Sequence, residues 1–193
     1  MYLRTSIVFL ASLALVACHK PQQQASTTSE PGATSPAGPA KGVDRSHRGK
    51  ATVDATFEDP DGKETNLTGF SGKPLLVNLW ATWCAPCVKE LPTLNRLALS
   101  HDKDGSLQVL AVSQDSGPHA SVEAFLKKAK IHKLDAYQDA KSNLSSALGA
   151  EVLPTSILFD ASGHEVWRYV GDLDWTSPEA AKLLSEAGGP RPR

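Results

Sequence analysis

Two stretches of the chain are predominantly apolar over the length of a strand. The first covers Pro74–Thr82 and the second covers Leu107–Asp115. A strand with one face in water alternates apolar and polar residues, whereas a continuous apolar run predicts a strand that is buried on both faces. We therefore expect both segments at the centre of a sheet with its two sides covered.

Turn residues separate further pairs of strand-like segments. A β-hairpin is expected within residues 51–68, around Pro60–Gly62, and a second within Pro154–Gly171, around Ala161–His164. A short strand is expected near Ala136–Gln138. The edges of the central sheet should therefore be built from antiparallel pairs.

Helical periodicity marks the remaining segments. Within Ser121–Ile131, apolar residues recur at spacings of three and four, at Val122, Phe125, Leu126 and Ala129. Further helices are expected at residues 85–100, 142–150 and 178–187. Strands that alternate with helices predict an α/β fold, and the hairpins make its sheet mixed.

The first 50 residues follow a different pattern. Arg4 precedes an apolar run, Ile7–Ala17, which is shorter than the roughly 20 residues of a membrane-spanning helix and typical of a signal-peptide core. Residues 18–50 are rich in Gln, Ser, Thr, Pro, Gly and Ala, so they bury too little apolar surface to offset the entropy of ordering. We expect a signal peptide at 1–17, a flexible tether at 18–50, one domain at 51–188 and a tail at 189–193.

Composition narrows the range of functions. The 193 residues carry a formal net charge of −1, with 40% hydrophobic and 21% charged residues. A nucleic-acid-binding domain is normally clearly basic. We therefore expect no nucleic-acid partner.

The chain has three cysteines, and an odd number in an exported protein needs an explanation. The apolar run ends in Leu15–Cys18, which resembles the lipobox of bacterial lipoproteins. That resemblance implies that Cys18 is lipidated and anchors the chain to a membrane surface without spanning it. His19 follows, where an aspartate would favour retention at the inner membrane, so the outer membrane is favoured. Cys84 and Cys87 then remain as a matched pair.

Three interpretations of the sequence WCAPC, residues 83–87, stay open at this point. A structural zinc site usually takes four ligands, and the chain has neither a second Cys-x-x-Cys nor closely spaced histidines. A purely structural disulfide would close a very small loop, and the stabilisation from loop closure grows with loop length. We therefore expect no metal at the pair.

The third interpretation is a redox pair. Cys84 would follow a buried strand and stand at the N-terminus of a helix, where the macrodipole and free N–H groups favour the thiolate. That thiolate attacks a disulfide and Cys87 resolves the mixed disulfide. The pattern favours thiol-disulfide exchange.

The segment LLVNLWATWCAPCVKELP, residues 75–92, closely resembles the active-site segment of the TlpA/ResA-like thiol-disulfide oxidoreductases, which are membrane-tethered members of the thioredoxin superfamily. The resemblance runs from about Thr52 to the last helix. It implies a thioredoxin-like α/β fold with a central mixed sheet flanked by helices, an N-terminal hairpin and a strand-helix insertion at about Ala136–Gly149.

The resemblance also implies roles for individual residues. Cys84 matches the nucleophile and Cys87 the resolving thiol. The sequence VLPTSILFD, which begins at Val152, resembles the strand entry where the superfamily has a cis-proline facing the disulfide, and this assigns Pro154. Leu153 would pair with the substrate chain through its backbone. Trp83 and Thr155 are also expected to take part in substrate binding.

One position departs from thioredoxin itself. A buried aspartate accepts the proton of the resolving thiol there, and here Asn78 takes its place and cannot titrate. TlpA/ResA-like proteins share this asparagine and carry a glutamate that matches Glu90. We expect Glu90 to act as the acid/base for Cys87, which lies three residues before it on the helix. The alternative is an exposed glutamate near a helix N-terminus.

The resulting hypothesis is a periplasmic, lipid-anchored reductase of protein disulfides, as in cytochrome c maturation. Its expected partners are protein disulfide substrates and a membrane thiol-transfer electron donor of the DsbD/CcdA kind, and no cofactor is expected. Alternatives are a copper-carrying metallochaperone-like protein, a thiol peroxidase and a non-catalytic binding module. The metallochaperone lacks its usual thioether ligand, since the one methionine is Met1.

Overall fold

The computed structural model describes residues 41–188, and within them the sequence-predicted strands and helices form. The strands are β1 (Gly42–Asp44), β2 (Phe57–Glu58), β3 (Glu64–Thr65), β4 (Leu75–Trp80), β5 (Gln108–Ser113), β6 (Tyr137–Gln138), β7 (Thr155–Phe159) and β8 (Glu165–Val170). The helices are α1 (Ala85–His101), α2 (His119–Lys128), α3 (Asn143–Leu148) and α4 (Pro178–Leu184), with 3-10 turns η1 (Leu67–Phe70) and η2 (Ser185–Gly188).

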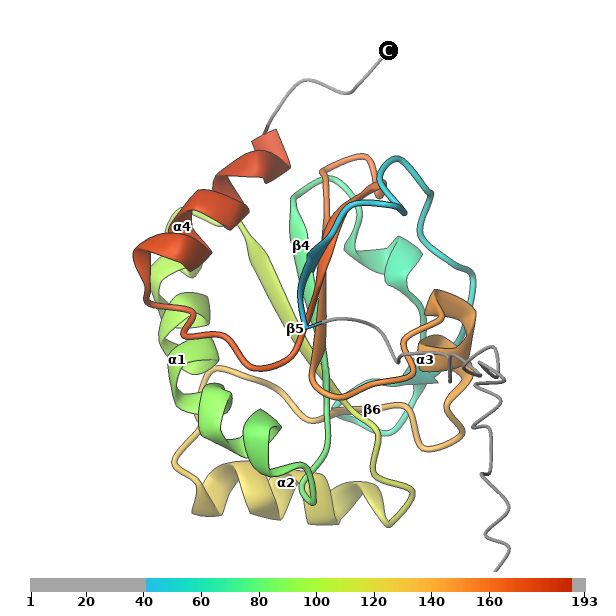
Figure 1. Cartoon of the computed structure of the whole chain (residues 1–193). Coiled ribbons are helices and arrows are strands. Elements are labelled where there is room, and N and C mark those ends of the chain that lie inside the picture. Colours follow the sequence, from blue (N-terminus) through green and yellow to red (C-terminus); the bar gives the residue numbers. More distant parts are fainter. Residues whose placement is uncertain (1–40, 189–193) are drawn as a thin grey trace, which may run out of the picture. The chain divides into compact units, whose positions relative to one another are not determined.

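Residues 41–188 build one mixed sheet of eight strands in the order β1-β8-β7-β4-β5-β6-β2-β3. The β4–β5 and β5–β6 pairs are parallel, and the other neighbours are antiparallel. Helices α1 and α4 lie on one side of this sheet and α3 lies on the other (Figure 1). This is the thioredoxin-like arrangement that the resemblance implies.

Strand β4 lies between β5 and β7, and all six of its residues are buried. Successive side chains of a strand point to opposite faces. Leu76 and Trp80 therefore join the apolar cluster on the α1 side, while Leu75, Val77 and Leu79 join the cluster on the α3 side. Each fully buried leucine contributes roughly 2 kcal/mol of transfer free energy. The continuous apolar run in the sequence thus reflects a strand with two buried faces.

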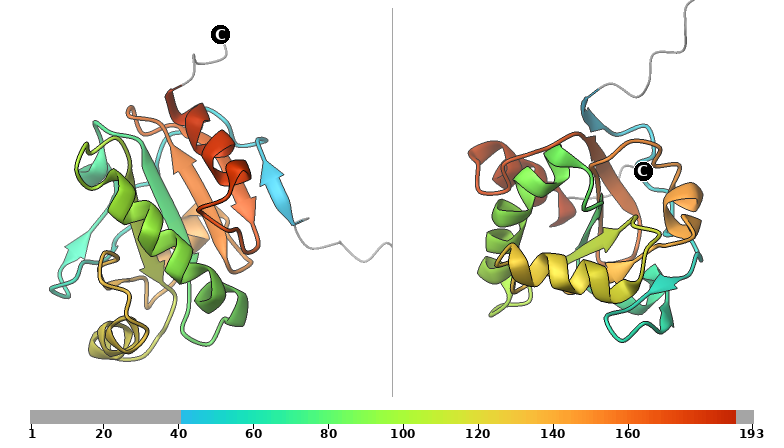
Figure 2. Two further views of the ribbon diagram at one scale, coloured as in Figure 1. Left: turned by 90° about the vertical axis from the view of Figure 1, so that its left-hand side faces the viewer. Right: turned by 90° about the horizontal axis from the view of Figure 1, so that it is seen from below.

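Helices α1, α2 and α4 cover the first of these clusters, as Figure 2 shows from two further directions. Helix α2 contributes Val122 and Leu126, which are buried as its periodicity predicts. Phe125 is half-buried against Trp80, with ring centroids 5.7 Å apart. Ala129, which shares this spacing, is the exposed C-cap residue of α2.

The start of the domain also differs from the expectation. Residues Gly42–Asp44 pair antiparallel with β8, and the guanidinium groups of Arg45 and Arg48 both contact the Glu186 carboxylate. The Thr52 N–H donates to the Gly163 carbonyl at 2.8 Å. Residues 41–50 are therefore ordered parts of the domain rather than tether, because their backbone groups complete the edge of the sheet. The expected signal peptide, the tether up to residue 40 and the tail at 189–193 lie outside the described residues.

Helix α3 ends at Leu148, and its C-cap is Gly149, whose φ of 62° lies in the left-handed region. Its N–H donates to the Ser146 carbonyl at 3.0 Å, which closes the helix before the chain turns toward Pro154. A Cβ built on Gly149 would meet nothing within 4 Å, so only backbone conformation disfavours a side chain there.

We predict that Gly149→Ala lowers the free energy of unfolding by about 1 kcal/mol, because an L-residue pays for the left-handed conformation. Urea unfolding of the purified protein measures the change. Gly69→Ala is the matched control, since Gly69 has equal space but no positive φ. Equal effects of the two substitutions would contradict the assignment of the cost to backbone conformation.

Candidate active site

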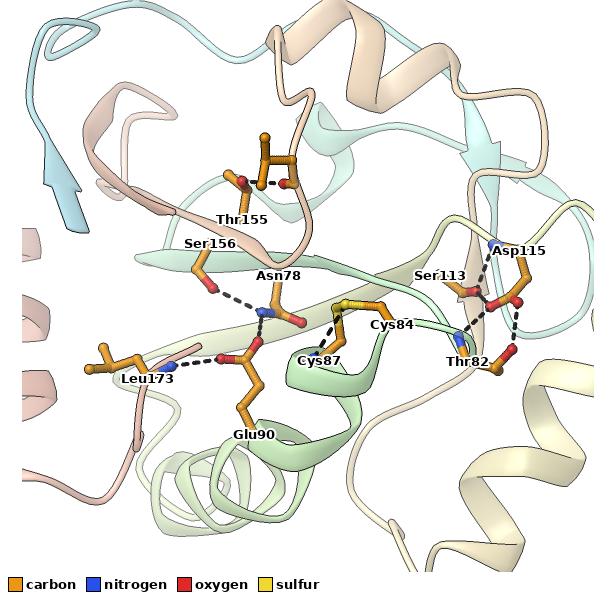
Figure 3. Close-up of a disulfide and its surroundings, with 11 residues drawn as sticks. Asn78, Thr82, Cys84, Cys87, Glu90, Ser113, Asp115, Thr155, Ser156 and Leu173 are labelled. Atoms are coloured by element: carbon orange, nitrogen blue, oxygen red, sulfur yellow. Dashed lines mark hydrogen bonds between the residues drawn. A yellow bond between two sulfur atoms is a disulfide. The ribbon is translucent and has the colours of Figure 1, made fainter. Parts of the chain in front are cut away.

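Cys84 and Cys87 form a disulfide at the N-terminus of α1 (Figure 3). Cys84 is the N-cap residue, and its Sγ accepts a hydrogen bond from the Cys87 N–H at 3.4 Å. The exposed fraction is 6% for Cys84 and 0% for Cys87, so Cys84 is the sulfur closer to solvent. The positive end of the helix dipole and the free N–H groups of the first turn therefore face Cys84.

A tight turn carries the chain from β4 into α1. The Cys84 N–H donates to the Ala81 carbonyl at 3.1 Å, and the Val88 N–H donates to the Cys84 carbonyl at 3.0 Å. Pro86 lies in the first turn of the helix, where a missing N–H leaves no intrahelical bond unmade. Trp83 lies in the turn and is 70% exposed, although tryptophan is usually mostly buried.

The Leu153–Pro154 peptide bond is cis, as the resemblance implies. Leu153 is half-buried and packs against the apolar cluster that contains both cysteines. The expectation for Thr155 was wrong as far as its side chain is concerned. Thr155 is 2% exposed and its hydroxyl donates to the Val152 carbonyl at 2.6 Å, so it closes its own turn and does not reach the surface.

Glu90 lies one turn after Cys87 on α1 and is only 3% exposed, which excludes the alternative of a solvated surface glutamate. Its Oε1 accepts from the Asn78 amide at 2.7 Å, and its Oε2 accepts from the Leu173 N–H at 3.0 Å. The Asn78 amide also donates to the Ser156 hydroxyl at 2.9 Å. Figure 3 shows this network below β4, next to the disulfide.

Burial raises the pKa of Glu90 to about 7 from an ordinary value of 4.5. The hydrogen bonds from Leu173 and Asn78 favour the carboxylate and limit this rise, while the nearby negative charge of Asp172 adds to it. A buried carboxyl group with a pKa near neutrality exchanges a proton readily at physiological pH. The site thus combines a redox pair with a titratable acid on one helix.

No group of three or more His, Cys, Asp or Glu residues within residues 41–188 could hold a metal ion. The same part of the chain contains no helix that is both long and apolar enough to cross a membrane. Cys18, the expected lipidation site, lies outside the described residues.

Comparison with known proteins gives the family. The Redoxin family model matches residues 47–184, which is most of the chain. The chain belongs to the redoxin family. Within that family, it is of the ResA/TlpA-like kind.

Individual relatives support this family assignment of residues 47–184, called the redoxin domain below. The chain is similar to the thiol-disulfide oxidoreductase ResA of Geobacillus thermodenitrificans, with 33% identity over 60% of this chain and 64% of that protein. The ResA of Bacillus thuringiensis subsp. konkukian is 32% identical over 64% of this chain and 70% of its own length. The chain thus spans slightly less than two thirds of the first relative and slightly more of the second.

Among solved structures, the fold is similar to a putative thiol:disulfide interchange protein DsbE from Chlorobium tepidum. The TM-score is 0.63 and the identity 24%, covering 73% of this chain and 98% of the other. At that identity the likeness concerns the fold.

Sequence reasoning missed several polar partners within the redoxin domain. Ser156 and the Leu173 N–H complete the environment of Glu90, and Asp115 binds the turn before Cys84. Nothing in the local pattern distinguishes Asp115 from an ordinary residue that caps a strand. The buried serine within the apolar run Pro154–Asp160 was the one available signal, because a buried hydroxyl requires a partner.

We predict that Glu90→Gln raises the free energy of unfolding of the oxidised redoxin domain, relative to wild type, at neutral and higher pH. The pKa of Glu90 is raised on folding, so its stabilising contribution is complete below pH 4.5 and is lost as pH rises to about 7. The wild type should therefore lose about 3 kcal/mol of unfolding free energy over this window, and the variant should not. Urea unfolding between pH 4.5 and 8 measures the difference.

Glu123→Gln on the exposed face of α2 is the control, and it should follow the wild type at each pH. Parallel curves for wild type and Glu90→Gln would contradict the raised pKa.

Proposed function

We propose that this protein is an extracytoplasmic reductase of protein disulfides, with Cys84 as nucleophile and Cys87 as resolving thiol. The observation that carries the proposal is the helix-capping disulfide, with the less buried sulfur at the N-cap and a cis-proline turn packed nearby. The pair needs no metal or cofactor for this chemistry, because the sulfur atoms themselves carry the electrons.

The reaction begins with the reduced pair. The Cys84 thiolate attacks one sulfur of a substrate disulfide, a mixed disulfide forms, and the other substrate sulfur leaves as a thiolate that takes up a proton. Cys87 then loses its proton, and its thiolate attacks Cys84 Sγ. The Cys84–Cys87 bond forms, the mixed disulfide breaks and the second substrate sulfur leaves. Two electrons pass from the enzyme to the substrate.

Glu90 is proposed to take the proton of Cys87. The group is buried one helical turn away, and its pKa of about 7 lets it accept a proton near neutral pH. Asn78 supports both states of this acid. Its amide donates to the carboxylate, and its buried oxygen, which has no partner among the described residues, can accept from the protonated carboxyl group once the amide rotates.

The substrate is proposed to bind across Trp83 and Leu153. The indole of Trp83 offers a large exposed apolar surface beside Cys84, and such surfaces commonly take part in protein contacts. The backbone of Leu153, which precedes the cis-proline, would pair with an extended substrate segment. This geometry suits a protein disulfide in an unfolded or flexible segment.

Export and anchoring complete the proposal. Residues 1–17 would act as a signal peptide, Cys18 as the lipidated anchor and residues 18–40 as the tether, with the outer membrane favoured. Periplasmic disulfides, including those of apocytochromes c before haem attachment, would be the substrates. A membrane thiol-transfer protein would return two electrons to the Cys84–Cys87 disulfide by the same exchange in reverse.

The decisive experiment is trapping. We predict that Cys87→Ser accumulates mixed disulfides on Cys84 when it is incubated with an extracytoplasmic extract, because no resolving thiol remains. Non-reducing electrophoresis detects the adducts. Cys84→Ser is the control and should trap at least tenfold less, since Cys87 is fully buried. If Cys87→Ser captures nothing and the wild type also fails to reduce a model disulfide, the reductase proposal falls.

A second prediction isolates the proton transfer. We expect Glu90→Gln to slow the resolution step by about 10²-fold at pH 8, the low end of general-base effects. The step is followed by forming a Cys84–thionitrobenzoate adduct and measuring release of the chromophore by Cys87 in stopped flow. The wild-type rate should rise with pH through about 7, in line with the pKa of Glu90, and this rise should be absent in the variant.

Glu123→Gln should retain the wild-type profile. The same pH dependence in Glu90→Gln and wild type would remove Glu90 from the mechanism.

A further inference from the structure

A cluster of hydrogen bonds lies on the other side of the disulfide from Glu90, and its centre is Asp115 (Figure 3). Asp115 Oδ2 accepts from the Thr82 N–H at 3.0 Å, and Oδ1 accepts from the Thr82 hydroxyl at 2.6 Å. The Ser113 hydroxyl donates to Oδ2 at 2.6 Å. The chemistry proposed above assigns no role to this carboxylate.

Thr82 occupies a sensitive place in the chain. It lies inside the turn that links Ala81 to Cys84, so its position determines how Cys84 enters the helix. Asp115 binds both its N–H and its hydroxyl, and two bonds on one residue restrict rotation as well as translation. The Gln114 N–H also donates to the Trp80 carbonyl at 2.7 Å. The segment after β5 therefore holds the end of β4 at two adjacent points.

Asp115 is itself held from the far side by the insertion. Gln138 of β6 is 1% exposed, and its side-chain amide donates to the carbonyls of Asp115 and Gly117, the latter at 2.8 Å. A chain of direct contacts therefore runs from Gln138 through Asp115 to Thr82 and on to the turn of Cys84. The hydrogen bonds of this chain are partly buried, so breaking one would leave polar groups incompletely solvated, and the chain holds the local geometry for that reason.

We propose that Asp115 is a positioning residue for the redox pair, and that Gln138 fixes Asp115 in place. The inference rests on the proposed redox function of Cys84 and Cys87. A Cys84 thiolate gains stabilisation from the N–H groups of the first helical turn only while its sulfur stays over that turn. The Asp115–Thr82 contact keeps Cys84 there and so stabilises the dithiol state relative to the disulfide.

Two pairs of variants test this. Asp115→Ala removes the acceptors, whereas Asp115→Asn can keep them, because its oxygen accepts from the Thr82 N–H and its amide donates to the Thr82 hydroxyl. Thr82→Val removes only the hydroxyl, and Thr82→Ser keeps it. The control is Asp104→Ala. Asp104 also binds an N–H and a hydroxyl, those of Ser106, but it lies beyond the other end of α1.

The readout is the equilibrium constant of the Cys84–Cys87 pair against glutathione, measured with the full chain. We expect Asp115→Ala to favour the disulfide about tenfold more than wild type does, which corresponds to about 30 mV toward a more reducing potential. Thr82→Val should shift the constant in the same direction by about threefold and remains informative if Asp115→Ala fails to fold. Asp115→Asn, Thr82→Ser and Asp104→Ala should stay within twofold of wild type.

The outcomes separate the two proposals. A wild-type pair that exchanges with glutathione, together with unchanged constants in Asp115→Ala and Thr82→Val, would overturn the positioning role and leave the reductase function intact. A shift in Asp115→Asn equal to that in Asp115→Ala would also overturn it, because charge rather than hydrogen bonding would then be responsible. A wild-type pair that does not exchange would instead count against the reductase function.

A separate variant tests the proposed role of the insertion, in which Gln138 fixes Asp115 in place. Gln138→Met keeps the volume of the side chain and removes its donors, so it should shift the constant in the direction of Asp115→Ala. If the equilibrium constant of Gln138→Met against glutathione equals that of wild type, Asp115 holds its position without β6.

Discussion

Strand β4 must bury both of its faces, and the rest of the domain is arranged around that requirement. It pairs with β5 and β7, carries apolar side chains to both clusters and ends in the turn before Cys84. The same alternation that sends Leu76 and Trp80 toward α1 sends Asn78 there as well, since it lies between them in the strand. The one polar side chain of the strand therefore meets the helix that holds the cysteines, and the redox pair and its acid belong to the same core.

Burial gives Glu90 its chemical character. A carboxyl group in water would be ionised at neutral pH and would exchange protons poorly with a thiol. Because Glu90 is enclosed between α1, β4 and Leu173, its pKa lies near neutrality, where both protonation states are populated. This placement reduces stability above neutral pH, and natural active sites often carry such a cost. The domain can tolerate it because the apolar clusters on both sheet faces supply most of the favourable free energy.

Different parts of the fold supply the polar residues on the two sides of the disulfide. Glu90 and Asn78 lie on one side, within the core shared by thioredoxin-like proteins. Asp115 lies on the other, where the loop after β5 meets the turn before Cys84, and Gln138 connects this loop to the strand of the insertion. An insertion far from the cysteines in sequence is thus joined to their turn by direct hydrogen bonds. The arrangement would let changes in the insertion adjust the redox pair without altering the cysteines or the residues between them.

The sequence by itself determined the helices, the strands other than β1, and the Cys-x-x-Cys pair, because those depend on local periodicity and on the spacing of Cys84 and Cys87. It also indicated Pro154 and Glu90, through their resemblance to a family, but not the surroundings of either. Only the tertiary structure decided that Glu90 is buried, that the Thr155 hydroxyl is used inside its own turn, and that β1 closes the edge of the sheet. It also placed Asp115 against Thr82, a contact between residues 33 positions apart. Burial and long-range hydrogen bonds depend on which segments come into contact in the folded chain. No local sequence pattern specifies those contacts.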